Sequence, residues 1–199
     1  TSLPAPQAAL VEDLHAVWTR LFADILGAPF GTFTVVIPEA RITTPCGRAG
    51  PDWIAFFCPE NRTTYIGLGF IAKFAGAPGV TPESLLSFVI AHEFGHHVQL
   101  ELEATGRPAI PPEARARLAL AERIKRHEVQ ANCYVGVFLH HAPARPGQVT
   151  AAAIEAALAA TQAVNIGSHG SLDQRLRWFR AGLAGGSIEA CDTFAADHL

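Results

Sequence analysis

The sequence contains no methionine, no Cys-x-x-Cys pair and no internal repeat, and only 17% of its 199 residues are charged. The missing Cys-x-x-Cys pair argues against a structural zinc ribbon and against a thioredoxin-type redox site. No apolar run reaches membrane-spanning length, so we expect no membrane span in this chain. The net charge of −3 gives no field that would attract nucleic acid, and we expect none as a partner. Because Met is absent and the chain begins at Thr1, we expect that an N-terminal segment has been removed.

The composition is that of a globular protein. Hydrophobic residues make up 49% of the chain, which excludes the disordered and fibrous classes. A length of 199 residues is enough for one domain with a sizeable core. We therefore expect a single domain over residues 1–199.

The four cysteines are Cys46, Cys58, Cys133 and Cys191. An even number permits two disulfides in three possible connectivities. Pairing Cys46 with Cys58 is the shortest closure, and Cys133 would then pair with Cys191. The alternative is four reduced, buried thiols in a cytosolic protein. We favour the disulfides, and with them an extracytoplasmic location as a secreted, periplasmic or membrane-anchored protein.

The central motif of the chain is His-Glu-x-x-His, formed by His92, Glu93 and His96. Residues four apart lie on one face of a helix, so the two imidazoles can bind one metal ion. Glu93 lies off the metal axis but within reach of a water at the metal. The alternative is a pair of helix histidines that bond core or surface groups. The apolar residues 84–91 before the motif favour a buried metal site, because buried polar groups need partners.

Residues 7–26 have apolar side chains at helical spacing and are followed by Gly27 and Pro29, so they predict an amphipathic helix. Residues 32–37 are typical of a strand, and residues 53–58 and 63–66 of an antiparallel hairpin. The exposed edge of such a sheet could bind an extended peptide, or the sheet could simply cover the core.

The metal-binding helix is predicted from Pro82 to about Ala104, with Thr81 as its N-cap. Residues 113–139 predict a further helix, basic in its first half and apolar nearly all round in its second. A nucleic-acid patch on the basic half is less favoured than a solvated face. Residues 149–164 predict an Ala-rich helix, and a capping box at Ser171 opens the last one.

A catalytic zinc ion needs a third protein ligand. Gln99 and Leu102 stand where a metzincin would have Gly and His, which excludes that class. Glu128 is preferred because it enters the apolar half of its helix, and Asn132 one turn later could accept a hydrogen bond from a ligand imidazole. An ion pair between Glu128 and a nearby arginine is the alternative. The remaining candidates are Glu103, His127, His140, His141 and His169.

Several segments together resemble the neutral zinc metallopeptidase family of bacteria: residues 92–99, 128–137, 169–179 and 191–194, with the surroundings of Cys46 and Cys58. The resemblance implies a zincin-like fold with Glu128 as third ligand, and an N-terminal export or membrane segment. With the pattern above, the fold class is α+β, mostly helical, with a small antiparallel sheet before the zinc helix. Members usually have Asp where this chain has Asn132.

Two functions from different classes fit these observations. The first is a zinc-dependent endopeptidase with one catalytic zinc at His92, His96 and Glu128, with Glu93 as general base and a peptide or protein as substrate. In it, His169 would donate a hydrogen bond to the oxygen on which charge develops, or else only cap the helix that follows. The second is a non-catalytic zinc module that binds a partner protein. Glu93 favours the first, because structural zinc needs no base.

Overall fold

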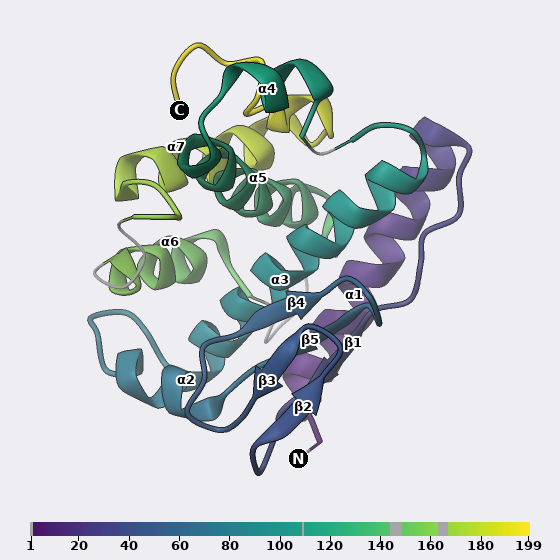
Figure 1. The fold of residues 1–199 in the computed structure, drawn as a ribbon. Helices are drawn as coiled ribbons and strands as arrows, with labels where there is room; N and C mark the ends of the chain where they lie inside the picture. The colour runs from purple at the N-terminus through teal and green to yellow at the C-terminus, as the bar shows by residue number, and fades with distance from the viewer. Residues whose placement is uncertain (1, 109, 144–148, 163–166) are drawn as a thin grey trace.

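The computed structural model describes residues 2–108, 110–143, 149–162 and 167–199 as a mixed α+β fold in which helices predominate (Figure 1). The helical elements are α1 (Ala5–Leu21), η1 (Phe22–Leu26), α2 (Leu68–Phe74), α3 (Pro82–Ala104), α4 (Pro112–Arg117), α5 (Leu120–His141), α6 (Ala151–Ala160), α7 (Leu172–Gly185) and η3 (Glu189–Cys191). The strands are β1 (Thr34–Val36), β2 (Ile42–Thr44), β3 (Gly47–Ala49), β4 (Phe56–Cys58) and β5 (Thr63–Tyr65).

The first predicted helix is present as α1, and it continues without a break into the π-helical turn η1. Leu14, Trp18 and Phe22 bury one face of it in the main core. Gly27 ends the turn in the left-handed conformation, at φ 60°, which glycine adopts at little cost.

The strands form a three-stranded sheet, in the order β1-β5-β4, and a separate antiparallel hairpin of β2 and β3. The predicted hairpin is confirmed, because β4 and β5 pair antiparallel. The expectation of a wholly antiparallel sheet is wrong, because β1 and β5 pair in parallel. The connection from β1 to β5 contains three strands, long enough for β5 to return in the same direction. β4 lies at the edge of the sheet.

The long helix α3 has the predicted bounds, Pro82–Ala104. Thr81 caps its N-terminus by accepting a hydrogen bond from the Ser84 backbone N–H, and the Ser84 hydroxyl accepts in return from the Thr81 N–H. Nearly every residue from Leu85 to Gly95 is buried, so α3 crosses the centre of the molecule (Figure 1). The sheet lies against one side of it, and α5, α6 and α7 lie on the other.

The helix predicted over residues 113–139 is interrupted. Leu118 and Ala119 are extended, with ψ values of 139° and 153°, and they separate α4 from α5. The basic face is only partly solvated, because Arg126 is buried, bonds Glu122 and donates to the Ala196 carbonyl. This arginine attaches the C-terminal segment to α5.

The last two predicted helices are present as α6 and α7. Thr150 caps α6, and the predicted box of Ser171 and Gln174 caps α7. The predicted end of the Ala-rich helix, beyond residue 162, lies outside the described residues. The short helix α2 was not predicted, because its seven residues lack a clear apolar period.

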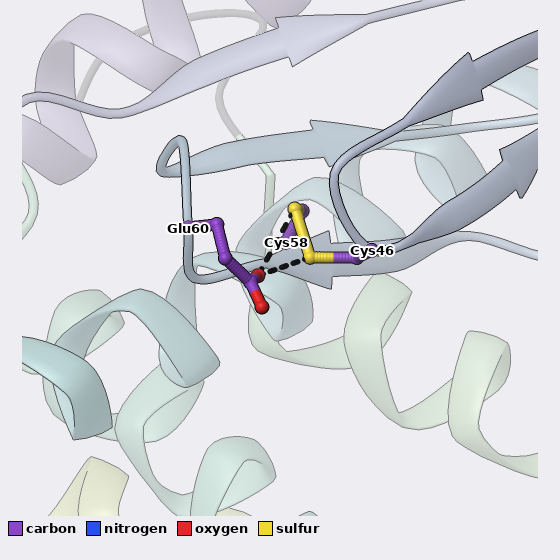
Figure 2. A group of neighbouring side chains, drawn as sticks. All are labelled: Cys46, Cys58 and Glu60. Carbon is purple, nitrogen blue, oxygen red and sulfur yellow. Dashed lines mark hydrogen bonds between the residues drawn. A yellow bond between two sulfur atoms is a disulfide. The ribbon is translucent and has the colours of Figure 1, made fainter.

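Both predicted disulfides are present, Cys46–Cys58 and Cys133–Cys191. The first joins the β2–β3 turn to the end of β4, and Figure 2 shows the Glu60 carboxylate lying against both of its sulfur atoms. Because both sulfurs are in the disulfide, neither is available as a thiolate metal ligand. The second is completely buried and joins α5 to η3. No helix in the described part of the chain combines the length and the hydropathy that a membrane span requires.

Candidate metal centre

The two motif histidines lie on one face of α3, with their ring centroids 5.0 Å apart. Both rings are largely buried, and His92 is only 8% exposed. The helix can bring them this deep because Gly95, between them in sequence, meets α5. A Cβ at Gly95 would lie 2.8 Å from the Ala131 carbonyl oxygen, so only glycine permits this approach of the two helices.

The close crossing places Glu128 of α5 opposite the histidine pair. Glu128 Oε2 is 3.2 Å from His92 Nε2 and 3.3 Å from His96 Nε2. Within the described residues, these three side chains form a group whose ligand atoms all lie within 4.8 Å of one another. The alternative ion pair with an arginine is not made, because Arg126 pairs with Glu122 instead.

Each of the two imidazoles has its second nitrogen bonded to a side-chain amide. His92 Nδ1 lies 3.0 Å from Asn132 Oδ1, the contact expected from the sequence, and His96 Nδ1 lies 2.7 Å from Gln99 Oε1. An amide oxygen can only accept, so each Nδ1 carries a hydrogen, and when the rings are neutral each Nε2 has its lone pair free for a metal ion. Both Nε2 atoms therefore face Glu128 in the tautomer that binds a metal ion.

Gln99 is a site residue whose role the sequence analysis missed. Its amide nitrogen donates to the His127 carbonyl and to Gln130 Oε1, and Gln130 in turn donates to the Cys191 carbonyl. The chain of bonds fixes the orientation of Gln99 and so that of His96. The only signal in the sequence was that Gln99 follows His96 by three residues, on the same helix face.

The donor set fits zinc. Zinc–nitrogen and zinc–oxygen bonds of about 2.0–2.1 Å in a tetrahedron put neighbouring donor atoms about 3.4 Å apart. The measured contacts of Glu128 Oε2 with the two Nε2 atoms, 3.2 and 3.3 Å, are close to that value. Two histidines and one glutamate are also a usual ligand set of catalytic zinc, which leaves the fourth position open.

The charges at the centre are arranged to hold a cation. Burial raises the pKa of Glu128, but the His96 and His92 imidazoles outweigh burial and hold that pKa well below its usual range. Burial lowers the pKa of His96, but the Glu128 carboxylate outweighs it and raises the pKa to about 9. In the absence of metal, a proton on His96 thus neutralises Glu128. A divalent cation would take the place of that proton.

Glu93 is buried beside the ligand group without belonging to it. Its side chain is 7% exposed, and burial raises its pKa above the usual value. The Phe57 backbone, on the edge strand β4, lies next to this carboxylate and offsets part of that rise. A carboxylate with a raised pKa is suited to take up and release a proton.

His169 approaches the centre from the loop before α7. Its Nε2 lies 3.1 Å from Glu128 Oε2, and its ring stacks on that of His92 with centroids 5.9 Å apart. It nevertheless stands outside the group of three ligands. Burial lowers its pKa to about 4, so the ring is neutral near pH 7. The Glu128 carboxylate can only accept, so the neutral His169 ring carries its hydrogen on Nε2, and the Ser168 hydroxyl, 2.7 Å from Nδ1, donates to that nitrogen.

The other candidates for a third ligand are not in this group of three. Glu103 is exposed and pairs with Arg115. His127 stacks on the His96 ring, and burial lowers its pKa to about 3. His140 and His141 bond backbone carbonyls of α7 and its cap, at the far end of α5.

The centre lies in a cleft of about 610 Å³ that runs along α3. Its walls combine the charged and polar groups above with an apolar side made by the edge strand and the helices next to it. The apolar lining residues include Ile54, Phe56, Phe57, Phe70, Phe88 and Val89. A cleft with an apolar wall beside a few convergent polar groups is typical of a ligand-binding site.

The fold and this centre define a mixed α+β protein in which two histidines and one glutamate could hold a metal ion. A model of the family described as "Putative neutral zinc metallopeptidase" matches residues 7–194, and the chain belongs to that family. The uncharacterized protein Rv2575 of Mycobacterium tuberculosis is 31% identical, over 94% of this chain and 69% of its own length. The uncharacterized protein YpfJ of Escherichia coli K12 is 30% identical, over 89% of this chain and 66% of its own. No solved structure matches significantly.

Proposed function

We propose that this chain is a zinc-dependent endopeptidase. The observation that carries the proposal is the buried Glu93 carboxylate, which lies beside three convergent ligands at the floor of a cleft without being one of them. A purely structural zinc site has no use for such a group, and it needs a fourth protein ligand. Membership of the zinc metallopeptidase family supports the same conclusion.

His92, His96 and Glu128 would hold the zinc ion. When bound, zinc supplies Lewis acidity and makes an attacking water more acidic. Glu93 accepts a proton from that water as the water oxygen adds to the carbonyl carbon of the peptide. The same carboxyl group then gives the proton to the leaving amine as the carbon–nitrogen bond breaks.

His169 would stabilise the negative charge that develops on the carbonyl oxygen. It is neutral and carries its hydrogen on Nε2, which points at the ligand group. A donor held by Ser168 and by the start of α7 needs little reorganisation when charge develops.

The edge strand β4 would bind the substrate backbone. β4 lines the cleft and has no strand partner on its outer side within the described residues. An extended peptide can add to such an edge through main-chain hydrogen bonds, with its side chains against the apolar wall. The two disulfides support an extracytoplasmic site of action.

The test compares the wild type with a Glu93→Gln variant on an unbiased peptide mixture, read by mass spectrometry with and without chelator. The wild type should bind about one zinc per chain and cleave the mixture. The Glu93→Gln variant should keep the zinc and the fold and lose cleavage, because an amide cannot accept the proton. Glu128→Ala should lose tight zinc binding. A wild type that binds zinc tightly but cleaves nothing would instead support the non-catalytic zinc module.

A further inference from the structure

One cation in the cleft is not used by the mechanism above. Arg175 of α7 lines the cleft with Thr161, Ser168 and His169, and only 1% of it is exposed. Burial lowers its pKa to about 10, so the guanidinium is still charged near pH 7. It is the only permanently charged cation among the lining residues; the other basic groups there are histidines.

The hydrogen-bond partners of this guanidinium are neutral. It donates to the Leu158 carbonyl at 2.6 Å and to Thr161 Oγ1 at 3.3 Å, both at the C-terminal end of α6. Its Nε is buried without a hydrogen-bond partner, and no carboxylate among the described residues pairs with it. The negative end of the α6 dipole offsets the charge only in part. A buried charge usually has a counter-ion, because desolvation costs several kcal/mol otherwise.

The other arginine of α7 with a defined partner shows the contrast. Arg180 is exposed and bonds the Glu155 carboxylate with both Nε and Nη2, each at 2.8 Å. On the same two helices, α6 and α7, the exposed arginine is therefore neutralised and the buried one in the cleft is not. Because Arg175 lines the cleft, an anion bound there would lie next to it.

The direction in which a peptide would lie in the cleft indicates which anion would bind Arg175. The Phe57 backbone of β4 lies next to Glu93, and Arg62, in the turn after β4, bonds Glu101 two helical turns later. β4 therefore runs in the same direction as α3. A peptide that adds antiparallel to β4, the more stable pairing, has its C-terminal end toward the start of α3.

Arg175 lies at that end of the cleft. Its partners lie at the C-terminal end of α6, which packs on α3, and a Cβ added at Gly79, just before α3 begins, would lie 3.5 Å from the Cβ of Ala156 in α6. Figure 1 shows α6 beside the N-terminal end of α3. The acidic Glu103 lines the cleft at the opposite end, about 22 Å along the helix from Phe88.

We propose that Arg175 binds the free C-terminal carboxylate of the peptide substrate, so that cleavage is directed to the C-terminal end of the chain. The proposal rests on the peptidase function proposed above. A carboxylate in the cleft can interact with the guanidinium and offset its uncompensated charge. A C-terminal amide offers neither the charge nor a second acceptor oxygen.

The experiment uses one mixture of decapeptides, longer than the cleft, synthesised as free acids and again as C-terminal amides. The wild type should cleave the acids about 10- to 100-fold faster in kcat/KM, the usual range for a charged hydrogen bond. Its cleavage sites should lie at a constant distance from the C-terminus. Equal rates for acids and amides, or sites spread evenly along the peptides, would overturn the proposal.

Variants of Arg175 test whether this residue causes the preference for acids. Arg175→Gln should abolish the preference for acids, Arg175→Lys should keep part of it, and the control Arg180→Gln should keep all of it. Melting curves report whether each variant folds. If Arg175→Gln does not fold, the cleavage rates of the wild type on the acid and amide peptides still test the proposal. A folded Arg175→Gln protein that keeps the preference contradicts the proposal.

A binding measurement separates this proposal from the peptidase function. Zinc-loaded Glu93→Gln protein should retain the acid mixture more strongly than the amide mixture in affinity selection read by mass spectrometry. Stronger retention of acids, with no cleavage by the wild type, would support the carboxylate site and reject the peptidase. Equal retention, with cleavage by the wild type, would reject the carboxylate site alone.

Discussion

The two imidazoles that face Glu128 are held by neutral amides, and we expect this to influence how strongly they would bind a metal ion. An amide oxygen orients an imidazole, but it polarises the ring less than a carboxylate does. His92 depends on Asn132 in this way, and His96 depends on Gln99.

Asn132→Asp should raise the zinc affinity, by up to the roughly 10–100-fold typical of changes next to a ligand. A carboxylate that accepts from His92 Nδ1 makes Nε2 a better donor to the metal. Competition with a chromophoric chelator measures the change. The matched variant Asn132→Ala should lower the affinity, because His92 then loses its orienting partner. Equal affinities for all three proteins would show that this hydrogen bond does not influence the metal.

His169→Ala should lower kcat about 10²–10³-fold, the usual loss for one donor to a developing oxyanion. Zinc content and Tm should stay near the wild-type values, because His169 lies outside the ligand group. His140→Ala is the matched control, since that histidine bonds the Leu183 carbonyl away from the cleft. Loss of zinc or of the fold on replacing His169 would make it a ligand or a structural residue.

Single residues could be predicted where the chemistry is local in sequence. The spacing of His92 and His96 places both on one helix face, whatever packs against it. Contacts made across elements could not be predicted in this way. The approach of the Phe57 backbone to Glu93 and the hydrogen bond of Gln99 to Gln130 bring together residues far apart in the chain. They depend on how the sheet and α5 approach α3.

At the scale of elements, the site depends on the crossing of α3 and α5. α3 carries His92, Glu93 and His96, and α5 carries Glu128. The bounds of α3 were predicted correctly because Thr81, Pro82 and Gly106 give local signals for its two ends. The break before α5 and the parallel pairing of β1 with β5 were not predicted. Both follow from tertiary packing, for which the local pattern holds no signal.

Gly95→Ala should push α3 and α5 apart. The added methyl would lie 2.8 Å from the Ala131 carbonyl oxygen and 2.9 Å from its Cα, and backbone cannot give way as a side chain can. We expect the free energy of unfolding to fall by about 1–3 kcal/mol, as for other overpacked sites. Zinc affinity should fall with it, because the ligands lie on both helices. Urea unfolding and chelator competition measure the two effects.

Gly136→Ala provides the matched control for this crossing. Gly136 lies where α5 meets α7, and a Cβ there would approach the Phe179 carbonyl to 2.1 Å. This variant should also lose stability, but the molecules that stay folded should bind zinc almost as well as the wild type. If Gly95→Ala weakens zinc binding no more than Gly136→Ala does, the α3–α5 crossing does not set the ligand geometry.

At the scale of the whole molecule, the two disulfides hold different parts of the fold. Cys133–Cys191 joins α5 to η3, near the Gln130 side chain that fixes Gln99. Cys46–Cys58 joins the β2–β3 hairpin to the end of β4, the strand that lines the cleft. The first therefore supports the helical core and the metal ligands, and the second supports the wall against which a substrate would lie.

The two disulfides should differ in their resistance to thiol reductants in the folded protein. Cys133 and Cys191 are both fully buried, whereas Cys46 is exposed. Exchange needs direct attack of a thiolate on sulfur, so access decides the rate. Cys46–Cys58 should be reduced first, with loss of peptide cleavage but with zinc and helical structure retained. Cys133–Cys191 should be reduced only when the chain unfolds. Its replacement by two alanines should lower the free energy of unfolding by up to about 4 kcal/mol, from the entropy of closing its loop. Alkylation with mass spectrometry of digests gives the order of reduction, and free thiols in the untreated, oxidised protein would contradict both pairings.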